Sequence, residues 1–209
     1  MTSELIFKIA LAVFAYLVGS IPSGLVLSRA FGAADPRRHG SGNIGATNVA
    51  RVGGLGLGLA TLAADLFKGL IPVGVASAWV TTASASQLYP VALALLAVAG
   101  HLFPIYTGFR GGGKGVATAA GGFVLIAPLA VLFAAAAFVT YVCIFRRVSI
   151  GSLAAALILP FAVYATIDSG AASAGAALAS ALIFVRHAEN IRRLAAGTEP
   201  VFRIGRKKA

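Results

Sequence analysis

Between two long apolar runs lies the sequence Gly40-Ser41-Gly42-Asn43-Ile44-Gly45-Ala46-Thr47-Asn48-Val49-Ala50-Arg51. Its glycines allow turns that aim several backbone N–H groups the same way, and its small polar side chains add hydrogen-bond donors. The arginine that closes the stretch carries a planar fork suited to phosphate. We therefore interpret residues 40–51, the first polar loop, as a cradle for a phosphate or an acyl phosphate at a membrane surface.

The chain on either side of this loop is too apolar for a soluble domain. Of its 209 residues, 59% are hydrophobic and 11% are charged, and runs long enough to cross a bilayer recur from end to end. These runs are continuous rather than alternating, which favours helices over a β-barrel. The sequence predicts one all-α polytopic membrane domain, residues 1–209.

Seven transmembrane helices are predicted, some of them short or split. They lie at residues 5–30, 52–82, 90–103, 116–145 (divided in two at Pro128), 149–167 and 171–185. Undivided, the fourth of these runs would be about 45 Å long against a hydrocarbon core of about 30 Å. Division also returns Arg146 and Arg147 to the side of the other cations. The positive-inside rule then places the N-terminus outside and the C-terminus in the cytoplasm, with residues 83–89 as an external loop.

The net charge of +11 has a membrane explanation. In a soluble protein such a charge suggests nucleic acid, but here the basic residues gather in the predicted cytoplasmic loops, where they meet anionic lipid headgroups. The basic tail, with Arg203, Arg206, Lys207 and Lys208, is expected to contact the same headgroups. We predict the lipid bilayer as a partner and no nucleic acid.

Two nucleotide-binding patterns in the chain lack their required context. Residues 40–45 fit G-x-G-x-x-G, but no strand precedes them. Residues 108–114 fit G-x-x-x-x-G-K, but Gly115 follows where a P-loop needs Ser or Thr to bind magnesium. Neither a dinucleotide nor a nucleoside triphosphate is predicted as a ligand.

A second polar loop, residues 105–115, shares the predicted face of the first. It carries a run of glycines between Arg110 and Lys114, so it again offers amides beside cations. Beyond the last predicted helix, His187 and Asn190 would share a helical face if the helix continues. Two glycine–cation loops on one face are suited to an anionic substrate.

The chain has no familiar catalytic or metal-binding motif. His39, His101 and His187 stand apart from cysteines and carboxylate pairs, and no G-x-S-x-G elbow is present. We therefore expect no metal and no cofactor. A site of this kind would hold phosphates beside apolar grooves for an acyl chain, with amides and cations stabilising the developing charge.

Polar residues inside the apolar runs leave two interpretations open. Asp65 and Lys68 lie on one face of the second predicted helix, where they could form an internal ion pair or act directly on substrate. His101, near the end of the third, could be a capping residue or a site residue.

Three motifs in order resemble the bacterial acyl-phosphate:glycerol-3-phosphate acyltransferase family. They are residues 41–51, residues 100–101 with 114–118, and residues 187–194; residues 65–69 and 149–152 match weaker motifs. The resemblance runs from residue 19 to residue 199. It implies a multi-pass enzyme of the bacterial inner (cytoplasmic) membrane with its active site on the cytoplasmic face. That enzyme transfers an acyl group from acyl phosphate to the 1-hydroxyl of glycerol 3-phosphate, giving lysophosphatidic acid and phosphate.

The resemblance also implies roles for individual residues. Acyl phosphate would be held by Ser41, Gly42, Asn43, Gly45 and Thr47, and glycerol 3-phosphate by Arg51, Lys114, Ser152, His187 and Asn190. The catalytic residues would be His187, Ser41 and Lys114, and the hydroxyl proton would pass either to His187 or to the phosphate of the donor. A functional link to the enzyme that makes acyl phosphate follows. The family usually has Phe-Lys-Gly-Gly-Lys-Gly, whereas residues 109–115 contain one more glycine.

Two other functions fit parts of the pattern. A membrane transporter for an anionic phosphorylated metabolite would use the same basic face together with Asp65 and Lys68, but the uncharged loop 83–89 and the lack of an internal repeat argue against it. A scaffold that binds anionic lipid through its basic tail would need neither polar loop.

Overall fold

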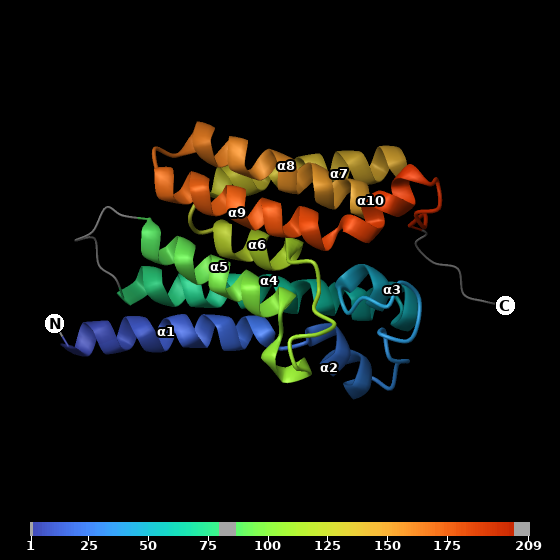
Figure 1. Ribbon diagram of the computed structural model, residues 1–209, viewed down its shortest axis with the longest axis horizontal. Helices are drawn as coiled ribbons and strands as arrows, with labels where there is room; N and C mark the ends of the chain where they lie inside the picture. The colour runs from blue at the N-terminus through green and yellow to red at the C-terminus, as the bar shows by residue number, and fades with distance from the viewer. Residues whose placement is uncertain (1, 80–86, 203–209) are drawn as a thin grey trace.

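The computed structural model describes residues 2–79 and 87–202, and every regular element among them is a helix (Figure 1). The elements are α1 (Thr2–Ser20), α2 (Ser23–Ala30), α3 (Ala46–Gly53), α4 (Leu55–Trp79), α5 (Leu88–Leu102), the 3₁₀ turn η1 (Ile105–Thr107), α6 (Val116–Phe123), α7 (Pro128–Phe145), α8 (Val148–Thr166), α9 (Gly170–Arg186) and α10 (Ala188–Ala195). The all-α prediction is confirmed over these residues.

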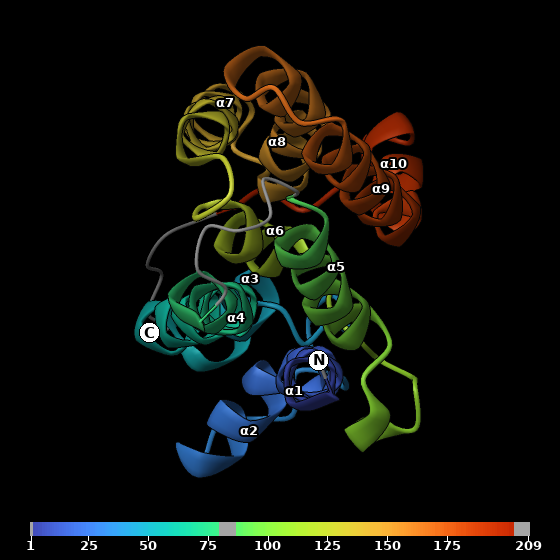
Figure 2. The ribbon, with the colours of Figure 1, turned by 90° about the vertical axis from the view of Figure 1, so that its left-hand side faces the viewer.

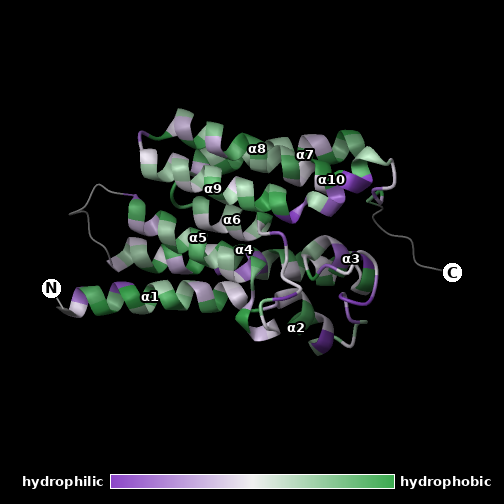
Figure 3. Ribbon diagram, in the orientation of Figure 1, coloured by the Kyte–Doolittle hydropathy of each residue, from purple (hydrophilic) through white to green (hydrophobic). Residues whose placement is uncertain are grey.

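The long helices run roughly parallel to one another in two groups (Figure 2). Helices α7, α8 and α9 pack together on one side, while α1 packs on α5 and α3 packs on α4 on the other. Helix α6 contacts α4 and α5, and α5 also contacts α9, so these two elements join the groups. Hydrophilic residues gather at the end of the bundle that holds α3, α10 and their connections (Figure 3).

The chain is a multi-pass membrane protein by the length and hydropathy of its helices. Five apolar segments are long enough to cross a bilayer: Ser3–Ser20, Leu55–Trp79, Leu88–Thr107, Pro128–Phe145 and Val148–Thr166. Helices α9 and α10 together form a sixth candidate, bent by 57° at their junction. Helix α6 has 8 residues. At 1.5 Å per residue it spans about 12 Å of a core of about 30 Å.

The predicted division of residues 116–145 is confirmed, because Pro128 begins α7. The prediction of one helix over residues 5–30 is wrong. Helix α1 ends at Ser20 and α2 begins at Ser23, on either side of Pro22, which has no N–H to donate. Of the external loop predicted at residues 83–89, residues 83–86 lie outside the described residues, as do the cations of the basic tail from Arg203 onward.

The prediction that residues 40–51 form one loop is wrong for their second half. Ala46–Gly53 is helix α3, and Gly54, with φ of 93°, separates it from α4. Both Asn48 and Val49 are buried, so this short helix is stabilised by packing rather than by its length. The turn at Gly54 folds α3 back against α4 and directs its N-terminus toward the interior of the bundle.

Helices α4 and α6 approach so closely that their contact requires glycine. A Cβ at Gly69 would overlap the carbonyl oxygen of Thr118, and a Cβ at Gly121 would overlap that of Leu66. Small residues of this kind allow helix backbones to touch within a membrane. The contact brings Asp65 and Leu66 of α4 beside α6, at the wall of the cavity described next.

Candidate active site

A cavity of about 350 Å³ lies where the two groups of helices meet, near the hydrophilic end of the bundle. It is lined by these predicted site residues: Ser41, Asn43, Gly45, Thr47, Arg51, Lys114, Ser152, His187 and Asn190. Gly42 is the predicted site residue that does not line it; its amide donates to the His39 carbonyl, with an N–O distance of 3.2 Å. Predicted site residues from four separate parts of the sequence therefore converge on one space.

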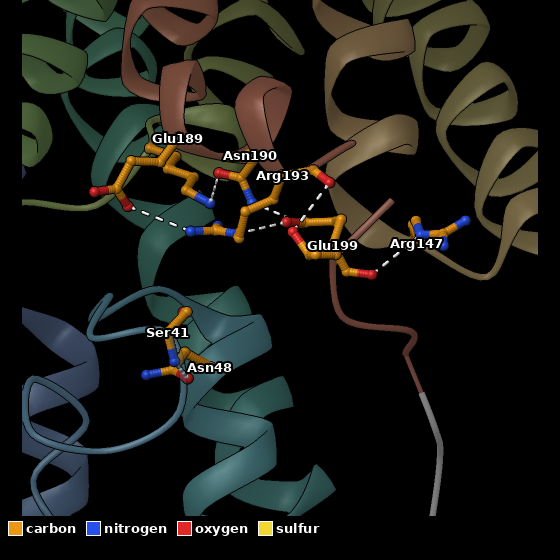
Figure 4. A network of polar contacts seen from close by, with 9 residues as sticks. Ser41, Asn48, Arg147, Glu189, Asn190, Arg193 and Glu199 are labelled. Atoms are coloured by element: carbon orange, nitrogen blue, oxygen red, sulfur yellow. Dashed lines mark hydrogen bonds and ion pairs between the residues drawn. The ribbon is translucent and has the colours of Figure 1, made fainter. Parts of the chain in front are cut away.

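Asn48 is the residue that holds the first half of the first polar loop in shape. Its side chain is 2% exposed and donates to the carbonyls of Pro36, His39 and Asn43 at 2.8, 3.0 and 2.8 Å. Its Oδ1 accepts the amide of Ser41 at 2.8 Å (Figure 4). Asn48 was predicted to lie in the cradle, with no substrate contact assigned to it, and these hydrogen bonds make it the residue that positions Ser41.

The free amides at this end of the cavity belong to Asn43 and to the start of α3 rather than to a nest of glycines. The amides of Gly42, Ser41 and Gly45 already donate within the loop. Those of Ala46 and Thr47, the first two residues of α3, donate to no acceptor among the described residues, and both residues line the cavity. The expected cradle is thus a helix N-terminus, where free N–H groups and the helix dipole favour an anion.

The glycines of the second polar loop do not offer their amides to the cavity as expected. The Gly113 amide donates to the His101 carbonyl at 3.1 Å, and a Cβ at Gly112 would overlap the carbonyl oxygen of Leu102. Lys114 and Gly115 line the cavity, while Gly111 to Gly113 do not. Gly111, with φ of 67°, faces open space, so it is the one of these three glycines that close packing does not hold.

Lys114 belongs to a polar network among residues that line the cavity. Figure 4 shows Asn190, Arg193 and Glu199 of this network. Its Nζ donates to Asn190 Oδ1 at 2.5 Å. The Asn190 Nδ2 donates to Glu199 at 2.7 Å, and Arg193 Nε donates to the same carboxylate at 2.8 Å. Arg147 donates to the Glu199 backbone carbonyl at 3.2 Å. The segment after α10 is thereby fastened beside the site.

Burial and charge set the protonation of two members of this network. Burial, offset only in part by Glu199, lowers the pKa of the Lys114 ammonium to about 8. For Glu199, burial alone would raise the pKa, but hydrogen bonding with Ser149, Arg193 and Asn190 outweighs it and lowers the pKa. At neutral pH the site therefore combines a charged lysine with a carboxylate that is already paired.

His187 sits at the bend between α9 and α10 and is 1% exposed. Its Nδ1 faces the Ile183 carbonyl oxygen at 2.8 Å. Because a carbonyl can only accept, this nitrogen carries the proton, and the neutral ring keeps an unprotonated Nε2. The predicted shared face with Asn190 survives the bend, since both residues line the cavity.

A buried ion pair lies deeper in the bundle, which confirms one of the two interpretations left open for Asp65. Lys68 Nζ is 2.7 Å from Asp65 Oδ1, and His101 Nδ1 is 3.6 Å from the same oxygen. All three side chains are buried, and Asp65 and His101 line the inner part of the cavity. Over residues 2–79 and 87–202 no group of three or more histidine, cysteine or carboxylate side chains could hold a metal ion.

Away from the cations the cavity continues as an apolar arm between α6, α7 and α8. Its walls are Ala119, Ala120, Val131, Ala134, Ala135, Phe138, Ala155, Ala156 and Leu159. Most of these side chains are small, so the arm is kept open by alanine rather than by a gap between helices. One cavity thus joins a cationic end to a hydrocarbon-like end.

Comparison with known proteins shows which family the chain belongs to. The chain matches the family model described as Glycerol-3-phosphate acyltransferase over residues 9–197. The chain belongs to the glycerol-3-phosphate acyltransferase family. The glycerol-3-phosphate acyltransferase of Syntrophotalea carbinolica is 47% identical over 203 residues, covering 97% of this chain and all of that protein. That of Geotalea daltonii is 45% identical over 203 residues, with the same coverage.

Two solved structures of another glycerol-3-phosphate acyltransferase share the fold. The glycerol 3-phosphate form of PlsY, an integral membrane enzyme, aligns with a TM-score of 0.87 at 36% identity, covering 94% of this chain and 96% of that one. The lysophosphatidic acid form of PlsY aligns with a TM-score of 0.83 at 34% identity, covering 94% and 95%. The family resemblance found in the sequence motifs is confirmed.

Proposed function

We propose that this protein transfers an acyl group from acyl phosphate to the 1-hydroxyl of glycerol 3-phosphate, giving lysophosphatidic acid and phosphate. The proposal rests on a cavity that joins phosphate-binding groups to an apolar arm, in a chain of this family. A substrate with a phosphate at one end and an acyl chain at the other fits that shape. PlsY, with the same fold, was captured with the acceptor and with the product.

The donor phosphate would bind at the N-terminus of α3. The free amides of Ala46 and Thr47 would meet its oxygens, with the side chains of Ser41, Asn43 and Thr47 around them. The acyl chain would extend into the apolar arm between α6, α7 and α8. Amides held in place by the loop and helix would stabilise both the developing oxyanion and the departing phosphate.

Glycerol 3-phosphate would bind at the cationic side. Arg51 and Lys114 would hold its phosphate, while Ser152, Asn190 and His187 would orient its hydroxyls. The 1-hydroxyl oxygen attacks the acyl carbonyl, a C–O ester bond forms, and the bond from the acyl carbon to the phosphate oxygen breaks. The hydroxyl proton passes to His187 Nε2 or to the phosphate of the donor, and phosphate leaves. Proximity in one cavity would supply much of the rate.

We further propose a topology of seven spans in one membrane domain, with the N-terminus outside and the site on the cytoplasmic face of a bacterial inner membrane. Helix α6 would count as the short fourth element, entering the membrane only part of the way. Arg51, Lys114, Arg147 and Arg193 gather at the end of the bundle that holds the cavity mouth, as the positive-inside rule requires. An enzyme that makes acyl phosphate would act immediately before this one.

The direct test is phosphate release by the purified protein in lipid, given acyl phosphate with and without glycerol 3-phosphate. We expect release to depend on the acceptor and lysophosphatidic acid to form in equal amount. Release without acceptor would instead mean a hydrolase. If phosphate is not released at all but solute flux occurs in liposomes, the protein is a transporter.

The pKa of Lys114 predicts how acceptor binding depends on pH. The second pKa of a phosphate monoester is about 6, so the charge of the substrate is constant above pH 7. Lys114, with a pKa of about 8, loses its charge as the pH rises through that value. We expect the KM for glycerol 3-phosphate to rise by about tenfold between pH 7 and 9, since each pH unit above the pKa removes about 90% of the charged form. Steady-state kinetics across this range measure it.

Lys114→Arg provides the control for this pH dependence, because an arginine side chain stays charged throughout the range. Its KM should remain flat between pH 7 and 9. If the KM rises equally in the wild type and in Lys114→Arg, the group that titrates is not Lys114.

Ala134→Phe predicts where the acyl chain lies. Ala134 on α7 is 7% exposed and lines the apolar arm, so a phenyl ring there would remove space for several methylenes. At about 0.8 kcal/mol per buried methylene, kcat/KM for a sixteen-carbon acyl phosphate should fall by at least about tenfold relative to an eight-carbon one. Ala136→Phe, on the exposed side of the same helix and outside the cavity, is the matched control. An unchanged ratio at Ala134 would place the chain elsewhere.

A further inference from the structure

Arg186, the last residue of α9, makes contacts that the mechanism above does not use. Its Nη2 donates to the Gly112 carbonyl at 2.7 Å and its Nε donates to the Gly113 carbonyl at 3.2 Å. Within residues 2–79 and 87–202 it has no carboxylate at ion-pair distance, and it does not line the cavity. A half-buried guanidinium is thus committed to two successive backbone carbonyls.

The same two residues are fixed from their other side by α5. The Gly113 amide donates to the His101 carbonyl at 3.1 Å, and a Cβ at Gly113 would overlap the His101 ring. Gly112 packs equally closely against the Leu102 carbonyl. The backbone immediately before Lys114 is therefore held between α5 and Arg186.

We propose that Arg186 is a positioning residue that fixes the Gly112–Gly113 backbone and thereby aims Lys114 at the phosphate of glycerol 3-phosphate. Glycine backbone is the most mobile that a chain can have, and a lysine side chain adds several free torsions. A ligand pays for every degree of freedom that it must freeze. With one end of this backbone clamped, the Lys114 Nζ is already in place beside Asn190 before substrate arrives.

The identity of the residue matters because of the geometry it serves. A planar guanidinium can donate to two neighbouring acceptors at once, whereas an ammonium on a flexible stem acts as a point donor. Arg186→Lys should therefore keep one of the two hydrogen bonds to the Gly112 and Gly113 carbonyls. Arg186→Gln should hold this backbone least firmly. This order of effects is what separates clamping from a general need for positive charge.

This inference rests on the proposed function, and its test measures turnover and direct calorimetric binding of glycerol 3-phosphate in the same preparations. For Arg186→Gln we expect the KM and the Kd for glycerol 3-phosphate to rise by about tenfold, with kcat and the KM for acyl phosphate within about twofold of wild type. For Arg186→Lys, the KM and the Kd for glycerol 3-phosphate should rise by about threefold. Arg192→Gln removes an exposed charge from α10 nearby and should change none of these values.

The double variant shows whether Arg186 acts through Lys114. In a Lys114→Ala background, adding Arg186→Gln should raise the KM by less than about twofold, because the group that it positions is gone. A full tenfold rise in that background would overturn the proposal, and so would an unchanged KM in Arg186→Gln. If Arg186→Gln does not fold, Arg186→Lys replaces it, and its KM is compared with and without the Lys114→Ala change. A wild type that binds glycerol 3-phosphate without making lysophosphatidic acid would refute the function, while the binding data would still test the clamp.

Discussion

Lys114→Ala is expected to raise the KM for glycerol 3-phosphate by about 10- to 150-fold while the KM for acyl phosphate stays within about twofold. A hydrogen bond to a charged group contributes about 1.5–3 kcal/mol, and each 1.4 kcal/mol is a factor of ten. Lys114 Nζ lies in the cavity beside Asn190, where burial makes its contact with a phosphate stronger than in water. In the proposed arrangement the acyl phosphate binds at the N-terminus of α3 and does not depend on Lys114.

A matched control for this change lies on the same loop. Arg110 is exposed and outside the cavity, so Arg110→Ala removes one positive charge without touching the site. If Arg110→Ala raises the KM as much as Lys114→Ala does, the loop attracts substrate by its net charge and not by contact. Both measurements should be repeated at high salt, because salt screens an exposed charge far more than a buried one. An effect of Lys114→Ala that persists at high salt indicates direct contact with the substrate.

Much of the fold could be predicted because the apolar runs are long and their interruptions are strong. Pro128 marked the start of α7, whereas the break at Pro22 between α1 and α2 was not predicted, because residues 5–30 read as one apolar run. Helix α3 could not be predicted, because its 8 residues are too few to be stable alone. It exists because Val49 and Asn48 are buried against neighbouring elements, and such tertiary contacts leave little trace in local sequence.

The candidate site could be predicted for residues that lie in sequence motifs. It could not be predicted for residues that reach the site through long-range contacts. The predicted site residues from Ser41 to Asn190 all line the cavity, with Gly42 as the exception. Glu199 was missed as a site residue because its contacts with Asn190 and Arg193 depend on how the chain turns after α10. The glycines before Lys114 were expected to present amides, but their small size serves packing against α5. A glycine run in sequence does not distinguish these two uses.

With His187 as the general base, His187→Ala is expected to lower kcat by at least about a hundredfold, the smallest loss typical of a missing general base; with the donor phosphate as the base, only substrate binding should weaken. The side chain is buried at the bend between α9 and α10 and lines the cavity, with Nδ1 facing the Ile183 carbonyl, so Nε2 is the nitrogen left to accept a proton. Steady-state turnover at saturating substrates measures the loss. Melting temperatures must accompany it, because removing a buried ring leaves a space that destabilises the fold.

His187→Gln decides where the hydroxyl proton goes. Glutamine can still form hydrogen bonds with Ile183 and with a substrate hydroxyl, but its amide has no basic nitrogen. If Nε2 takes the proton, kcat should fall in His187→Gln as far as in His187→Ala, by about a hundredfold or more. If instead His187→Gln keeps kcat within about threefold of wild type, the histidine only orients the acceptor. The proton then passes to the phosphate of the donor, which leaves carrying it, and the protein supplies position and charge rather than a base.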